Sequence, residues 1–196
     1  MYTLVKKSKI FFKCNKVPFM LSIVVYFFGF LLGMFVIYST NLNILNQMNL
    51  IDSVEVTHTL QRESTTLALI QNNCLMILIL LSGSFLLGLS TLINLLFNGY
   101  VFGMAIAGML QVSSLIKVLL LTVPHAIIEL PAIWFAGAAG FKMPYELVRY
   151  FVDKKNYIFN KKEIVDFLIL AFIAINLIMI AAFIEANLTM RIAEII

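Results

Sequence analysis

The chain has 196 residues, of which 62% are hydrophobic and 12% are charged, and its formal net charge is +4. Soluble domains are about 45–50% apolar and about 25% charged, so this composition excludes a soluble globular protein. The lysines flank long apolar runs, which is typical of membrane anchors and not of a nucleic-acid-binding protein. We therefore predict an all-α polytopic helical bundle in the lipid bilayer, with one transmembrane domain over residues 1–196.

The first predicted membrane span covers about residues 17–40 and follows a lysine-rich N-terminal segment. Within it, Gly29 and Gly33 form a pair of small residues four apart, which lets another helix approach closely. A polar stretch follows, and the second predicted span covers about residues 74–97.

The second span is expected to end at a break at Asn98-Gly99, since this dipeptide is typical of turns. The next apolar segment, residues 98–112, covers only about 22 Å of a ~30 Å hydrocarbon core. It is therefore predicted either to cross as a short third span or to turn back as a re-entrant hairpin. Gly99 and Gly103 give it a close-packing face.

The fourth and fifth predicted spans cover about residues 114–141 and 167–188, and an amphipathic segment lies between them at about 144–160. That segment is expected to lie on the cytoplasmic surface as a helix. If residues 98–112 cross the bilayer, both basic segments of the chain face the cytoplasm, as the positive-inside rule favours. We therefore predict a multi-pass cell-membrane protein with about five crossings, a cytoplasmic N-terminus and an external C-terminus.

The fourth span carries an imidazole and a carboxylate within the sequence PHAIIELP. His125 and Glu129 are four residues apart, so on a helix they share a face, which Ala132, Ala136 and Gly140 continue. A charge at bilayer depth costs about 2.5–3.5 kcal/mol, so the pair is expected to face the bundle interior. One alternative is that the flanking prolines open the helix locally and the pair lines a cavity of the bundle. The other is that the helix is only kinked and packs against its neighbours, with His125 and Glu129 hydrogen-bonded to each other.

Other polar residues are candidates for the same cluster, namely Glu185 of the fifth span and Asn72, Asn73 and Asn98 around the second. The catalytic candidates are His125, Glu129 and Glu185, because buried carboxyl and imidazole groups can serve as acid and base. The same three side chains are the available metal ligands. Zinc requires three or four ligands, so a zinc cofactor stays an open alternative.

The motif PHxxxExPA, present as PHAIIELPA and followed by AGAAGF, resembles the stage II sporulation protein M family. Matching positions extend over most of the chain: Asn72, Asn73, Asn98, Gly99, His125, Glu129, Pro131 and Glu185. The resemblance implies a multi-spanning bacterial or archaeal membrane protein. Family members typically carry glycine where this chain has Ala126, which bears only on helix flexibility.

The family's namesake acts with peptidoglycan-degrading partners during engulfment of the forespore, and other relatives are encoded beside circular bacteriocins. We therefore hypothesise a membrane-embedded component that binds a peptide or envelope partner, such as a hydrophobic peptide or other membrane proteins, in circular bacteriocin production or immunity. The first alternative is an intramembrane peptidase or cyclase that uses His125 and Glu129. The second is a small-solute or proton transporter, so whether the protein is an enzyme stays open.

Overall fold

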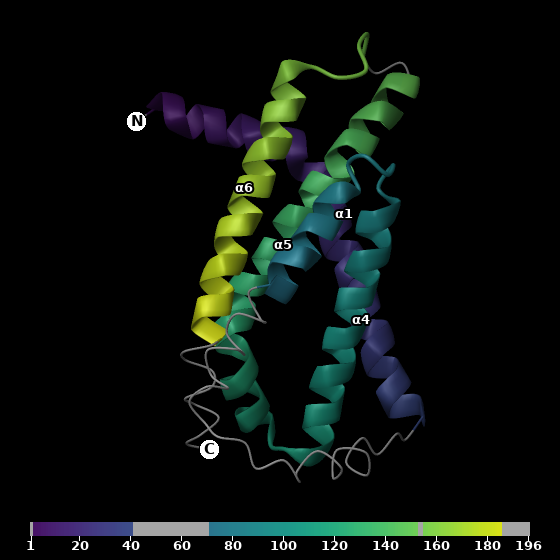
Figure 1. Cartoon of the computed structure of the whole chain (residues 1–196), viewed down its shortest axis with the longest axis vertical. Coiled ribbons are helices and arrows are strands. Elements are labelled where there is room, and N and C mark those ends of the chain that lie inside the picture. The colour runs from purple at the N-terminus through teal and green to yellow at the C-terminus, as the bar shows by residue number, and fades with distance from the viewer. Residues whose placement is uncertain (1, 41–70, 153–154, 186–196) are drawn as a thin grey trace.

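The structure, a computed structural model, describes residues 2–40, 71–152 and 155–185, with side chains described from Cys14 onward except those of Thr40, Val112 and His125. Within these residues there is no strand, and four helices are long and apolar enough to cross a membrane (Figure 1). They are α1 (Tyr2–Thr40), α4 (Leu89–Val112), α5 (Leu115–Phe151) and α6 (Lys161–Ile184). The predicted all-α membrane bundle is confirmed.

Two connections define the ends of the bundle. α5 ends and α6 begins at the upper end in Figure 1, whereas α4 ends and α5 begins at the lower end. Lys162 Nζ of α6 lies 3.4 Å from Cys14 Sγ, which places this part of α1 at the upper end. The helices α1, α4 and α6 therefore run downward, and α5 runs upward.

Glycines bring α1 and α4 together as a close parallel pair. A Cβ atom on any of four glycines would overlap a backbone carbonyl oxygen of the facing helix: Gly29 meets Leu96, Gly33 meets Tyr100, Gly99 meets Tyr26, and Gly103 meets Phe30. In lipid, helices associate through this kind of close backbone packing, because apolar side chains gain little by leaving the acyl chains. The four glycines thus set the separation of α1 and α4.

A short helix, Gln71–Ser82, and a turn at residues 83–88 precede α4. The turn requires left-handed backbone at two successive residues, with φ of 51° at Leu87 and 81° at Gly88. Gly88 adopts this conformation without steric cost, because it has no Cβ atom. The chain therefore reverses direction here, and α4 descends beside the short helix.

Hydroxyl groups hold the short helix and the turn against α5 and α4. Ser84 Oγ donates to Ala139 O of α5 at 2.6 Å, and Thr91 Oγ1 of α4 donates to Leu80 O at 2.7 Å. A Cβ atom on Gly140 would overlap that same carbonyl oxygen of Leu80. The small residues of α5, including the fully buried Ala132, Ala136, Ala138 and Ala139, thus let three elements meet at its centre.

The predicted break at Asn98-Gly99 is wrong. α4 is continuous through both residues, because Asn98 Nδ2 donates to Asn94 O at 2.7 Å within the helix and Gly99 packs against α1. The predicted spans at 74–97 and 98–112 are replaced by the short helix, the turn and α4. The described residues therefore contain four long helices where about five crossings were predicted.

The predicted surface helix at 144–160 is not a separate element. α5 continues past Pro144 to Phe151, and α6 begins at Lys161, earlier than the predicted start of the fifth span at residue 167. Buried ion pairs between these helices account for the difference, as described below. Residues 186–188 of the predicted fifth span lie outside the described part of the chain.

Candidate functional site

Three helices each contribute a polar group to one region of the bundle. Glu129 of α5 lies within electrostatic range of both Tyr26 of α1 and Glu185 at the end of α6. Tyr26 is only 4% exposed, and both carboxylates are half-buried. Residues more than fifty positions apart in sequence are thereby gathered at one place.

The packing of α1 on α5 explains the position of Tyr26. Ser22 Oγ donates to Trp134 O of α5 at 2.9 Å, which fixes the antiparallel register of the two helices. The next buried turn of α1 carries Tyr26, and it therefore meets α5 one turn below Trp134, where Glu129 lies.

Neither carboxylate has a basic partner among the described residues. No Lys or Arg side chain of these residues forms an ion pair with Glu129 or Glu185. The side chain of His125, one turn away on α5, lies outside the described side chains, so the predicted His–Glu contact stays a prediction. Ionised carboxylates are costly in a bilayer and repel each other, so these two side chains are candidates for contact with a bound partner.

The remaining predicted cluster residues have separate positions. The amide of Asn98 is bonded within α4, Asn72 is exposed, and Asn73 is buried on the short helix. Among the described side chains, no three His, Cys, Asp or Glu residues are grouped so as to hold a metal ion. A zinc site would need His125, and it stays a prediction.

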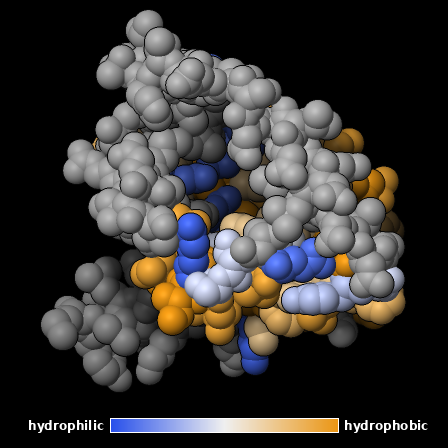
Figure 2. All heavy atoms as spheres, turned by 90° about the horizontal axis from the view of Figure 1, so that it is seen from below, coloured by the Kyte–Doolittle hydropathy of each residue, from blue (hydrophilic) through white to orange (hydrophobic). Residues whose placement is uncertain are grey.

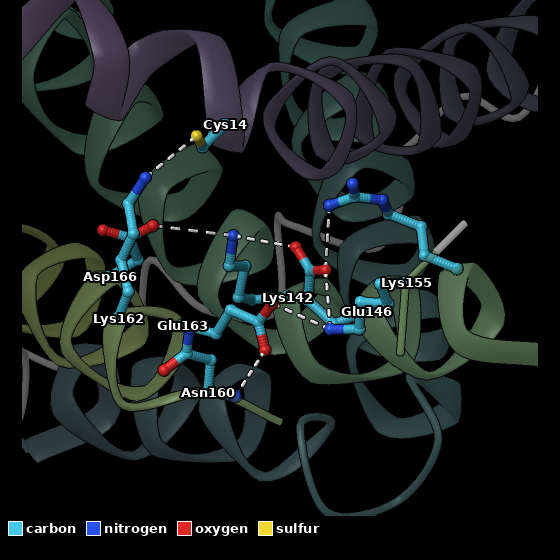
Figure 3. Close-up of polar contacts among 9 residues, drawn as sticks. Cys14, Lys142, Glu146, Lys155, Asn160, Lys162, Glu163 and Asp166 are labelled. Atoms are coloured by element: carbon cyan, nitrogen blue, oxygen red, sulfur yellow. Dashed lines mark hydrogen bonds and ion pairs between the residues drawn. The ribbon is translucent and has the colours of Figure 1, made fainter. Parts of the chain in front are cut away.

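A cluster of ion-paired side chains, buried at the upper end, joins α5 to α6 (Figure 3). Lys142 Nζ lies 3.2 Å from Glu146 Oε1 and 3.7 Å from Asp166 Oδ2. Lys155 Nζ lies 3.1 Å from Glu146 Oε2 and 2.7 Å from Glu163 Oε1. Lys142 and Glu146 are each 1% exposed, so these charges are shielded from water and compensate one another.

This upper ion-pair network also determines where α6 begins. The backbone N–H of Asn160 donates to Glu163 Oε2 at 2.9 Å and completes a capping box at the start of α6 (Figure 3). The lysines here were expected to be membrane anchors, and their burial was not predicted. The four-residue spacing of Lys142 and Glu146 and the acidic first turn of α6 were the available signals.

The lower end of the molecule has a different surface. Seen from below, hydrophilic and hydrophobic side chains are both visible on this face (Figure 2). Hydrophilic groups within a membrane protein are typical of binding and transport sites and not of lipid-facing surfaces. The upper network is charge-balanced and structural, so the functional candidates are the polar groups of the lower half.

Comparison with known proteins shows the family. The family model for stage II sporulation protein M matches residues 19–190. The chain belongs to the stage II sporulation protein M family. It is also 36% identical over 179 residues to an uncharacterized protein of Methanocaldococcus jannaschii, a match that covers 91% of this chain and 97% of that protein. No solved structure matches.

Family membership confirms the resemblance seen in the sequence. Tyr26, Glu129 and Glu185 all lie within the matched range, as does the upper ion-pair network. With its four long apolar helices, this member of the stage II sporulation protein M family is a multi-pass membrane protein.

Proposed function

We propose that the protein is a membrane-embedded binding component that receives a hydrophobic polypeptide segment, from a peptide or another membrane protein, in the lower half of its bundle. The observation that carries this proposal is the convergence of Tyr26, Glu129 and Glu185 from three helices. Polar groups at bilayer depth cost free energy, and a binding role gives a reason for keeping them together.

The packing of the bundle supports a binding site in its lower half. α1 packs mainly on α4, and α5 packs mainly on α6. The ion pairs of Lys142 and the hydrogen bond from Ser84 to Ala139 join elements in the upper half. Tyr26, Glu129 and Glu185 lie away from these contacts, where a hydrophobic segment could contact apolar and hydrophilic side chains together.

The basic residues suggest the orientation. Lys161 and Lys162 at the start of α6, Lys16 of α1 and Arg149 of α5 all lie toward the upper end. By the positive-inside rule we infer that this end faces the cytoplasm and that the lower end faces outward. A peptide at the outer membrane face would then approach the lower half of the bundle, which is compatible with a role in circular bacteriocin production or immunity.

Glu129→Gln is expected to separate binding from stability. Because this carboxylate has no described Lys or Arg partner, its replacement by a neutral amide should leave the Tm unchanged or raise it. The polypeptide that accompanies the wild-type protein through purification in mild detergent should be depleted, as measured by mass spectrometry. Lys161→Met changes an exposed residue at the other end of the molecule and is the matched control. This variant should retain the bound polypeptide.

A clear fall in Tm for Glu129→Gln, with bound polypeptide retained, would contradict this assignment. Glu129 would then be a structural residue of the bundle, comparable with Glu146 in the upper network.

A peptidase or cyclase is the second candidate. The carboxylates of Glu129 and Glu185 are brought into range by α5 and α6, and carboxyl groups can act as general acid and base. Incubation of the purified protein with a hydrophobic peptide distinguishes the two functions, since an enzyme yields a cleaved or ring-closed product by mass spectrometry. A small-solute or proton transporter remains a further alternative, and liposome flux assays would test it.

A further inference from the structure

We propose that the connection between α5 and α6, residues 155–160, lies in the headgroup layer of the bilayer and that Lys162 beside it binds anionic phospholipid headgroups. This inference is independent of the proposed polypeptide binding, which concerns the other end of the molecule. It follows from the depth of α1 and α6 in the membrane, from three exposed apolar side chains, and from the charges around them.

The charged residues of α6 and α1 mark the upper boundary of the hydrocarbon core. α6 carries no charged side chain from Phe167 to Ile184, and at 1.5 Å per residue this stretch covers about 27 Å of a ~30 Å core. Likewise, Lys16 is the last charged residue of α1 before its long apolar run. The contact of Lys162 Nζ with Cys14 Sγ, at 3.4 Å, puts the two boundaries at one level. Residues 155–160 precede α6 at its upper end in Figure 1, so they lie beyond the core.

The connection exposes three consecutive large apolar side chains. Tyr157, Ile158 and Phe159 are 50%, 45% and 46% exposed. Such a run is unfavourable in water and usually marks an interaction surface. Tyrosine is enriched where a bilayer meets water, because its ring is apolar and its hydroxyl group is polar. At this depth, the lipid interface is the surface that can cover all three side chains.

The upper ion-pair network holds this apolar segment in place at both ends. Lys155 Nζ, which is paired with Glu146 and Glu163, lies 5.3 Å from the centre of the Tyr157 ring. At the other end, the backbone N–H of Asn160 donates to Glu163 Oε2 at 2.9 Å (Figure 3). The segment is therefore anchored on both sides while its apolar side chains stay exposed, which lowers the entropic cost of binding to the interface.

The charge that faces outward here is positive. The described carboxylates of the upper end, Glu146, Glu163 and Asp166, are buried and paired with lysines. Lys16 and Lys162 are exposed, and neither forms an ion pair with a described carboxylate. Lysines at the surface of a membrane attract anionic lipids, whereas a zwitterionic lipid offers no net charge. Charge complementarity thus favours an anionic phospholipid beside Lys162.

Tryptophan fluorescence of the full-length protein in liposomes tests this proposal. Trp134 is the sole tryptophan of the chain, and its Nε1 has no hydrogen-bond partner among the described residues, so Trp134→Phe gives a suitable background. Phe159→Trp then introduces one tryptophan in the connection. The liposomes contain phosphatidylglycerol and phosphatidylcholine in one fixed ratio at low ionic strength. Either lipid in turn carries bromine, which quenches tryptophan on contact, near the headgroup end of its acyl chains.

We expect both brominated lipids to quench the Phe159→Trp protein, and the anionic lipid to be preferred. Lys162→Gln should reduce that preference about fivefold, the contribution of one lysine near an anionic surface, and leave quenching by brominated phosphatidylcholine in place. Phe172→Trp is the matched control, because this position is 69% exposed within the apolar part of α6. It should be quenched by both lipids without a comparable preference. Tyr157→Trp is the second probe if Phe159→Trp fails to fold.

Three results would overturn the proposal. If the control protein is quenched and the Phe159→Trp and Tyr157→Trp proteins are not, the connection lies in water or under another protein. Equal quenching by the two brominated lipids overturns the preference for anionic headgroups. A preference unchanged by Lys162→Gln overturns the assignment to this lysine. None of these results affects the proposed polypeptide binding at the other end.

Discussion

Replacing Gly99 by leucine is expected to separate α1 from α4 and to destabilise the protein strongly. A Cβ atom at this position overlaps the backbone carbonyl oxygen of Tyr26, which no rotamer change can move. Leucine is a better helix former than glycine by about 0.8 kcal/mol, so helix propensity alone predicts a higher unfolding free energy. Overpacking typically costs about 1–3 kcal/mol, and more when a backbone must shift, so the packing cost should exceed the gain in helix propensity.

Denaturant unfolding of the purified protein in mild detergent measures this effect. Ala105→Leu, on an exposed position of the same helix, adds the same side chain toward lipid and should leave the unfolding free energy within about 0.5 kcal/mol. If Gly99→Leu were as stable as Ala105→Leu, α1 and α4 would not be in backbone contact.

Lys142→Met should destabilise the protein by about 3–5 kcal/mol. The lysine is 1% exposed and contacts both Glu146 and Asp166, so its loss leaves buried anions short of a cation. Glu146 keeps Lys155 and Arg149 as partners, at 3.1 Å and 3.0 Å, whereas Asp166 keeps none of those described. Asp166 should therefore account for most of the loss.

A second substitution tests that explanation. Lys142→Met combined with Asp166→Leu removes a cation and an anion together, and the double variant should recover most of the stability that the single variant loses. Lys161→Met serves as the exposed control and should change the unfolding free energy by no more than about 0.5 kcal/mol. Additive losses in the double variant would mean that the two side chains do not act as a pair.

The sequence was sufficient to predict the long apolar helices, because hydrophobic run length depends on the bilayer and not on the fold. It was misleading at Asn98-Gly99. That dipeptide favours a turn locally, but close packing on α1 uses the same glycine inside a helix. The real turn lies at residues 83–88, where Ser82-Gly83-Ser84 and Gly88 carried the signal.

The charged residues show the same limit of sequence analysis. Lys142 and Asp166 are far apart in the chain, and nothing local indicates that α5 and α6 bring them together. For the candidate site, the sequence singled out Glu129 and Glu185 because ionisable groups are rare in membrane spans. The sequence did not predict a role for Tyr26, because it is one of many aromatic residues in the apolar segments. Only the packing of α1 against α5 places it near Glu129.

Cysteine cross-linking within the membrane tests most directly whether α5 and α6 bring the two carboxylates together. In a background with Cys14 and Cys74 replaced by serine, Glu129→Cys and Glu185→Cys are combined and treated with a short thiol-reactive cross-linker. Phe85→Cys with Phe167→Cys, whose rings lie 6.4 Å apart, is the positive control. Ile127→Cys with Glu185→Cys is the negative control, because Ile127 is 66% exposed.

Mass spectrometry of the digested protein reads out the result. We expect a cross-linked peptide pair joining positions 129 and 185, at a yield close to that of the positive control and well above that of the negative control. A yield no higher than the negative control, in a sample where the positive control reacts, would contradict the proposed site.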